Sequence, residues 1–170
     1  MNAVEWSPRS LRVLMVEDNP SDVRLVQAAC KHAGCGLDIS SAADGEEAFR
    51  YLAASSADSA GLPNLILLDI NLPGRNGFEV LDEIRADPAL HSIPVVILTS
   101  SQRDEDVERS YAHGANSYIS KPHTFDEFCQ VIVTLESYWY GVCRIPSQHG
   151  KADIGAVGNS SGPSRSAIGH

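Results

Sequence analysis

Short apolar runs alternate with amphipathic stretches along most of the chain. The runs predict five strands, at Leu11–Val16, Leu37–Ala42, Asn64–Asp69, Pro94–Thr99 and Asn116–Ser120. Between and after them, apolar residues recur at helical spacing behind capping residues, which predicts five helices. Strict alternation of strands and helices favours a doubly wound α/β fold, a five-stranded parallel sheet with helices on both faces.

The length of 170 residues matches one domain. The alternating pattern fills residues 11–145, preceded by an arm over 1–10. Residues 146–170 hold five Gly, five Ser and two Pro without a periodic apolar pattern. Such a composition is typical of a disordered tail, so we expect no second domain there.

The net charge of the chain argues against two classes of binding partner. Thirteen basic and 22 acidic residues give a net charge of −9, which disfavours non-specific binding to nucleic acid and docking on anionic membranes. No apolar run is long enough to span a membrane, and the first residues do not resemble a secretory signal. The four cysteines lack metal-ligand spacing, so we expect free thiols in the cytoplasm.

Acidic residues stand at the ends of two predicted strands. Glu17 and Asp18 directly follow the first strand, and Asp69 ends the third. In the flavodoxin-like strand order, these two strands flank the switch point where open parallel sheets bind ligands. Thr99 ends the fourth strand and Lys121 follows the fifth, so all five residues are expected at one edge of the sheet.

Three neighbouring carboxylates repel one another, by about 4 kcal/mol for a pair 4 Å apart at an effective dielectric constant of 20. Lys121 alone cannot balance Glu17, Asp18 and Asp69. A hard divalent cation can, and Mg²⁺ favours a few carboxylates together with water and phosphate oxygens. The pattern therefore predicts a magnesium site.

Four segments carry these residues: V-E-D-N-P at 16–20, L-L-D-I-N-L-P-G at 67–74 with Gly77, I-L-T-S at 97–100 and Y-I-S-K-P at 118–122. In order and spacing they resemble the receiver domain of two-component response regulators, over about residues 11–142. The resemblance implies the flavodoxin-like receiver fold. It also implies a single-domain response regulator that takes a phosphoryl group from a histidine kinase and signals to protein partners by a conformational switch, without being an enzyme in its own right.

The resemblance assigns roles at the acidic edge. Asp69 is the expected phosphoacceptor. Asp18 and Asp69 are expected to give side-chain oxygens to Mg²⁺, Asn71 its backbone carbonyl, and Glu17 a contact through water.

It assigns further roles around the phosphoryl group. Lys121 is expected to pair with carboxylate or phosphoryl oxygens, and Thr99 to hydrogen-bond the phosphoryl group. Tyr118 is the expected switch aromatic. The resemblance also implies a cis Lys121–Pro122 bond.

The last predicted helix extends from Phe125 to about Val142 and carries an apolar seam at heptad-like spacing. Tyr138 and Trp139 lie past the end of a short receiver helix, and they predict a homodimer or partner surface, with packing on the same domain as the alternative. The run Y-W-Y-G-V-C-R-I-P at 138–146 resembles single-domain regulators that partner phytochrome-type histidine kinases.

Two other functions stay open. An Asp after an apolar strand also resembles haloacid-dehalogenase-type phosphatases, but the second Asp of their motif is replaced by Asn71. A pseudo-receiver, which binds partners without taking phosphate, is the other alternative. The complete set of strand-end residues argues against it.

Overall fold

The computed structural model describes residues 10–58 and 61–145. Within them the chain forms one five-stranded sheet in the order β2-β1-β3-β4-β5, with every neighbouring pair parallel. The strands are β1 Leu11–Val16, β2 Leu37–Ala42, β3 Leu65–Leu68, β4 Val95–Thr99 and β5 Ser117–Ser120. The doubly wound, flavodoxin-like prediction is confirmed. The predicted tail, and all but the last residue of the predicted arm, lie outside the described residues.

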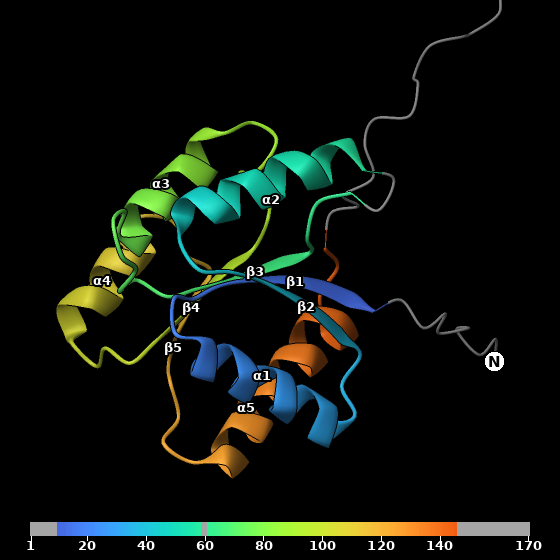
Figure 1. The fold of residues 1–170 in the computed structure, drawn as a ribbon. Coiled ribbons are helices and arrows are strands. Elements are labelled where there is room, and N and C mark those ends of the chain that lie inside the picture. The colour runs from blue at the N-terminus through green and yellow to red at the C-terminus, as the bar shows by residue number, and fades with distance from the viewer. Residues whose placement is uncertain (1–9, 59–60, 146–170) are drawn as a thin grey trace, which may run out of the picture.

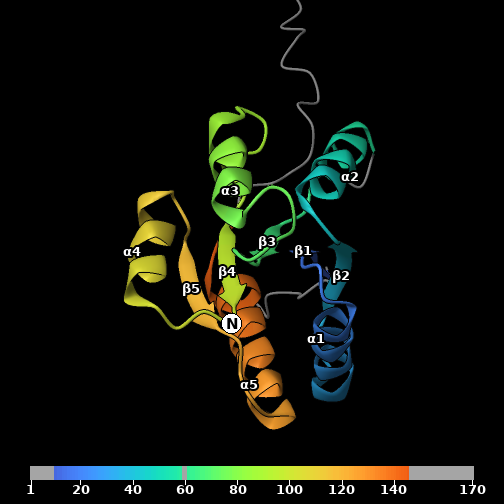
Figure 2. The ribbon, with the colours of Figure 1, turned by 60° about the vertical axis from the view of Figure 1, so that its left-hand side comes forward.

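Helices cover both faces of the sheet (Figure 1). They are α1 Pro20–Ala33, α2 Gly45–Ala57, α3 Gly77–Ala86, α4 Asp104–Ala112, α5 Phe125–Glu136 and the π-helix η1 Ser137–Val142. Helices α1 and α5 pack side by side on one face, while α2 and α3 lie on the other, and Figure 2 shows α4 beside the edge strand β5. No helix in 10–58 or 61–145 is long and apolar enough to cross a membrane.

Alternate side chains of the central strands feed two separate apolar layers. On β1, Leu14 and Val16 join the layer beneath α2 and α3, whereas Val13 and Met15 join the layer beneath α1 and α5. All residues of β3 and β4 are buried, as expected for strands covered on both faces. This packing fixes the strand register, and therefore fixes which residues emerge at the carboxyl edge.

The register brings the strand ends level with one another. Val16 pairs with Leu68, and Leu68 pairs with Ile97. The residues that follow β1 and β3 therefore start from the same edge of the sheet, close to the end of β4.

The C-terminal helix changes its winding, where the sequence analysis predicts one uniform helix. The π-helix η1 over Ser137–Val142 continues α5, and the Cys143 N–H donates to the Tyr138 carbonyl, five residues back, at 2.9 Å. The wider turn alters the angular spacing of the side chains. Trp139 and Tyr140 consequently both pack against the apolar layer shared with α1.

Candidate functional site

Three carboxylates meet at the carboxyl edge of the sheet. Glu17 and Asp18 come directly after β1, and Asp69 directly after β3. One oxygen from each lies within 4.8 Å of the others. Glu17 and Asp69 are buried, at 3% and 5% exposure, whereas Asp18 faces solvent. The structure thus brings together the three acids that the sequence analysis places in one crevice.

The ammonium group of Lys121 lies between the carboxylates of this cluster. Its ammonium nitrogen lies 2.5 Å from Glu17 Oε2 and 2.8 Å from Asp69 Oδ2, and its side chain is only 10% exposed. The backbone N–H of Lys121 donates to the Thr99 carbonyl at 2.7 Å, which ties the residue to the end of β4. The ammonium group therefore neutralises part of the buried acidic charge.

A third carboxylate on Lys121 escapes the sequence analysis. Asp22 Oδ2 lies 2.8 Å from the Lys121 ammonium nitrogen, from the first turn of α1. The sequence gives no reason to place Asp22 in the site, because an acid in the first turn of a helix is already explained by its favourable interaction with the helix dipole. Asp18 lies before the N-cap Asn19, outside the helix, so helical spacing does not link Asp22 to the acidic cluster.

Burial and pairing act differently on the two buried acids. Burial raises the pKa of the Glu17 carboxyl to about 7, against the opposing effect of hydrogen bonds from Lys121 and the Asn19 N–H. Burial would also raise the pKa of Asp69. Hydrogen bonds from Lys121 and the Asn71 N–H outweigh it, and the pKa of Asp69 lies below its ordinary value. Asp69 is therefore ionised at neutral pH.

Lys121 is charged for a related reason. Burial lowers its pKa, but the hydrogen bonds to Asp22, Asp69 and Glu17 outweigh burial, so the pKa lies above its ordinary value. An ammonium group surrounded by carboxylates in a partly desolvated site keeps its proton. It is a fixed positive charge beside Asp69.

A chain of hydrogen bonds leads from Asp69 to β5. The Asn71 N–H donates to Asp69 Oδ1 at 2.9 Å, and the Asn71 side-chain amide donates to Thr99 Oγ1 at 3.3 Å. The Ser101 N–H donates to the same Thr99 oxygen at 3.4 Å, and the Tyr118 hydroxyl donates to the Ser101 carbonyl at 2.9 Å. Thr99 is fully buried and Tyr118 half-buried, so the predicted switch pair is connected to the acidic cluster.

The loop after β3 approaches α3 very closely. The Gly77 N–H donates to the Ile70 carbonyl at 3.0 Å. A Cβ atom on Gly77 would lie 2.4 Å from the Asp69 carbonyl oxygen and 2.5 Å from Ile70 Cα, both backbone atoms. Only glycine fits at this position without moving the backbone that carries Asp69.

The donor set fits a hard divalent cation. All three grouped ligand atoms are carboxylate oxygens, the type that Mg²⁺ and Mn²⁺ accept. The exposed Asp18 makes no hydrogen bond or ion pair with the part of the chain described, so its oxygens are available to a ligand. The cluster, with its surplus of negative charge around Lys121, is suited to a cation that water can still reach.

The Lys121–Pro122 bond differs from the expectation. The described residues contain no cis peptide bond, so this one is trans. The general preference of X–Pro bonds for trans is only about 0.5–1 kcal/mol, and sequence alone does not decide between the isomers. The expected cis bond rested on the resemblance and is wrong for this structure.

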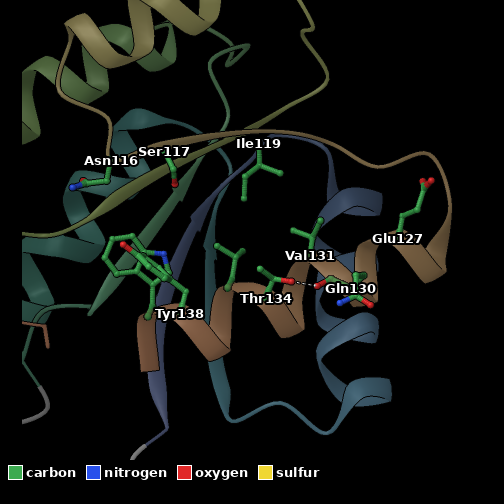
Figure 3. A pocket seen from close by; sticks show the side chains of 10 residues that line it. Asn116, Ser117, Ile119, Glu127, Gln130, Val131, Thr134 and Tyr138 are labelled. Carbon is green, nitrogen blue, oxygen red and sulfur yellow. Dashed lines mark hydrogen bonds between the residues drawn. The ribbon is translucent and has the colours of Figure 1, made fainter. Parts of the chain in front are cut away.

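The two predicted interface residues lie at the far end of α5, in η1. Tyr138 is 52% exposed, and its ring meets that of Trp139 edge-on with centroids 5.0 Å apart. Both line a groove of about 670 Å³ between β5 and α5. Figure 3 shows this groove, with Ser117 and Ile119 on one side and Tyr138 near one end.

A doubly wound sheet with buried acids and a lysine at its carboxyl edge is the arrangement expected of a receiver domain. Residues 13–133 match the response regulator receiver domain, and the chain belongs to this family. Receiver domains accept phosphoryl groups and bind a divalent metal. The family assignment supports the response regulator interpretation over the phosphatase and the pseudo-receiver.

Individual relatives match over most of their length. Response regulator Rcp1 of Synechocystis sp. is 37% identical over 136 residues, which cover 79% of this chain and 92% of Rcp1. A probable methanogenesis regulatory protein, FilR2 of Methanothrix harundinacea, is 37% identical over 134 residues, covering 79% of this chain and 86% of FilR2. Both relatives are regulatory proteins that the chain matches over more than four fifths of their own length.

Solved structures agree with this assignment. The phosphorylated cyanobacterial phytochrome response regulator RcpA superposes with a TM-score of 0.74 at 38% identity, over 82% of this chain and all of RcpA. The Mn²⁺-bound form of Rcp1 superposes with a TM-score of 0.70 at 36% identity, over 80% of this chain and 99% of that one. Both structures share the receiver fold of this chain, and one of them is a phytochrome response regulator.

Proposed function

We propose that Asp69 accepts a phosphoryl group from a phosphohistidine of a sensor histidine kinase. The observation that carries this proposal is the placement of Asp69, whose buried, ionised carboxylate lies 2.8 Å from the Lys121 ammonium group in a cluster of further acids. A carboxylate at a water-accessible edge, with a fixed cation beside it, combines a nucleophile with a group that stabilises phosphoryl charge.

In the transfer, a carboxylate oxygen of Asp69 attacks phosphorus in line with the donor nitrogen. The new O–P bond forms as the P–N bond breaks, and the bonding electron pair stays on the imidazole nitrogen of the donor. Lys121 moves one N–H from Asp69 to a phosphoryl oxygen and balances part of its charge. The chain mainly positions and neutralises, because phosphoryl transfer needs little covalent chemistry from the protein.

Asp18 and Asp69 would hold a divalent cation by their side chains, and Glu17 through water. Asn71, two residues past Asp69, would add its backbone carbonyl. When bound, Mg²⁺ supplies positive charge to the phosphoryl oxygens. The observation in favour of this set is the grouping of the three carboxylates within 4.8 Å.

The phosphoryl group would be sensed through Thr99 and Tyr118. The Thr99 hydroxyl already accepts hydrogen bonds from Asn71 and Ser101, and Tyr118 already bonds to Ser101. A new acceptor beside Asp69 would draw the Thr99 hydroxyl inward, and the Tyr118 ring would follow. The change would be read on the surface formed by α4, β5 and α5, where Tyr118 is half-buried.

The partner we propose is a phytochrome-type histidine kinase, in the cytoplasm. The similarity to RcpA and Rcp1 supports this choice, since RcpA is a phytochrome response regulator. Transfer to Asp69 from purified kinases of this and other types, compared under equal conditions, tests the choice of partner. Equal rates from unrelated kinases would contradict it.

Incubation with acetyl phosphate and Mg²⁺, followed by intact-mass measurement, tests the function itself. We expect the chain to gain the mass of one phosphoryl group, which is lost again at high pH. Continuous release of inorganic phosphate at a rate far above loss of the label would indicate a phosphatase. An unchanged mass, with no phosphate released, would indicate a pseudo-receiver.

A second proposal concerns self-association. Five of the ten residues that line the groove between β5 and α5 are apolar or aromatic, and the exposed Tyr138 is one of them. Within the described residues, β5 is an edge strand that pairs with β4 alone. We expect a second copy of the chain to cover this surface in a homodimer with two-fold symmetry. Since Trp139 packs against its own domain, Tyr138 is the better candidate for an intermolecular contact.

A further inference from the structure

Asp22 differs from the other acids around Lys121 in two respects. It comes from a helix, α1, whereas Glu17 and Asp69 directly follow strands of the sheet. It is also absent from the group of carboxylates whose oxygens lie within 4.8 Å of one another, which comprises Glu17, Asp18 and Asp69. Asp22 therefore contacts the ammonium group without belonging to the candidate metal cluster.

The ammonium group of Lys121 has three N–H donors, and three carboxylates occupy them. The distances are 2.5 Å to Glu17, 2.8 Å to Asp22 and 2.8 Å to Asp69. Two of these partners change during the proposed reaction. Asp69 becomes an acyl phosphate, and Glu17 shares its charge with the cation. Asp22 is the partner that takes part in neither phosphoryl transfer nor the candidate metal cluster, so the proposed reaction leaves its bond to Lys121 unchanged.

We propose that Asp22 is a positioning residue that holds the Lys121 ammonium group in place while Asp69 is phosphorylated. This rests on the proposed function of Asp69. A lysine side chain has four flexible torsions, and its ordering opposes any reaction that needs the ammonium group at one point. The bond to Asp22, a side chain only 27% exposed, fixes the nitrogen before the donor arrives. Lys121 then reaches the phosphoryl oxygens without a further loss of side-chain freedom.

The test compares initial rates of phosphorylation by acetyl phosphate at saturating Mg²⁺. A small donor avoids any effect of Asp22 on kinase docking. We expect Asp22→Asn to lower the rate by about five-fold, because the Asn oxygen can still accept a hydrogen bond from Lys121 but no longer carries the charge that strengthens it. Asp22→Glu, which keeps the charge, should recover at least half of the loss.

The matched control is Asp126→Asn. Asp126 is an exposed acid in the first turn of α5, so this change also removes one negative charge from the first turn of a helix. We expect it to leave the rate unchanged. Thermal melts of both variants report any general loss of stability, which should be small and similar.

Three results would overturn the role of Asp22. One is a wild-type rate in Asp22→Asn. Another is a slow Asp22→Asn whose rate returns to normal on raising Mg²⁺, because Asp22 would then act on metal affinity. The third is an Asp22→Glu variant as slow as Asp22→Asn. In each case the wild-type chain still gains a phosphoryl group, whereas failure of the wild type itself would overturn the function of Asp69 and the role of Asp22 together.

Discussion

The Lys121 ammonium nitrogen lies 2.8 Å from Asp69 Oδ2, although 52 positions separate the two residues in the chain. The parallel order of β1, β3, β4 and β5 creates this contact, because every strand ends at the same edge. The pair is buried, and it is embedded in an excess of negative charge. The first two predictions concern the balance between the positive charge of Lys121 and the negative charges of the acids around it.

Replacing Lys121 by Met should destabilise the fold. The buried Glu17 and Asp69 would lose their common counter-charge, and removal of one partner of a buried ion pair costs about 3 kcal/mol. We expect the loss at about pH 8 to exceed that at about pH 6, since Glu17 has a pKa raised to about 7 by burial and takes up a proton on acidification. Urea unfolding of variant and wild type at both pH values measures this loss of stability. Equal stability of the two proteins would contradict the pairing of Lys121 with the buried acids.

Asp18→Ala should remove the stabilisation that Mg²⁺ gives. Asp18 is exposed and has no partner in the described ranges, so its loss relieves repulsion and the metal-free fold should be as stable or slightly more stable. A ligand at 100 times its dissociation constant stabilises by about 2.7 kcal/mol. Thermal melts with and without Mg²⁺ should show this gain in the wild type and little of it in the variant. A lower melting temperature of the metal-free variant would indicate a capping role instead.

Gly77→Ala should impair both stability and phosphorylation. The new Cβ would lie 2.4 Å from the Asp69 carbonyl oxygen, so the loop must shift at a cost of about 1–3 kcal/mol. Gly141→Ala is the control, because a Cβ there meets nothing within 4 Å. Denaturant unfolding and acetyl phosphate labelling of the two variants give the comparison. Wild-type labelling of Gly77→Ala would show that Asp69 tolerates displacement.

Tyr138→Ala should weaken the proposed homodimer, by about 30-fold in dissociation constant for two half-exposed aromatic rings. Val133→Ala is a suitable control, because Val133 is an exposed apolar residue of α5 that does not line the groove. Sedimentation of the wild type, Tyr138→Ala and Val133→Ala measures the dissociation constant of each dimer. A wild type that stays monomeric at tens of micromolar, phosphorylated or not, would contradict the dimer.

Much of the site follows from the sequence because strand ends are easy to recognise. A continuous apolar run that stops at Asp69, and another that stops at Glu17 and Asp18, place three acids at one edge once the sheet is parallel. The flavodoxin-like pattern predicts the strand order, and the observed order β2-β1-β3-β4-β5 confirms it. Roles of single residues needed the family resemblance in addition.

Other features lie beyond such patterns. Asp22 reaches Lys121 only because α1 packs at a particular angle on the sheet, which no local spacing reveals. The π-helix over Ser137–Val142 escapes prediction because the seam of apolar residues fits α-helical spacing. The isomer of Lys121–Pro122 is decided by a small energy difference that tertiary contacts can override in either direction.

Chemical mapping of the phosphorylated residue tests the central claim most directly. Borohydride reduces an acyl phosphate to an alcohol, so a phosphorylated aspartate is converted to homoserine. After treatment with acetyl phosphate, Mg²⁺ and borohydride, peptide mass spectrometry should find homoserine at position 69, and none in the Asp69→Asn variant. Homoserine at position 18, or at any position other than 69, would contradict the assignment of Asp69 as the phosphoacceptor.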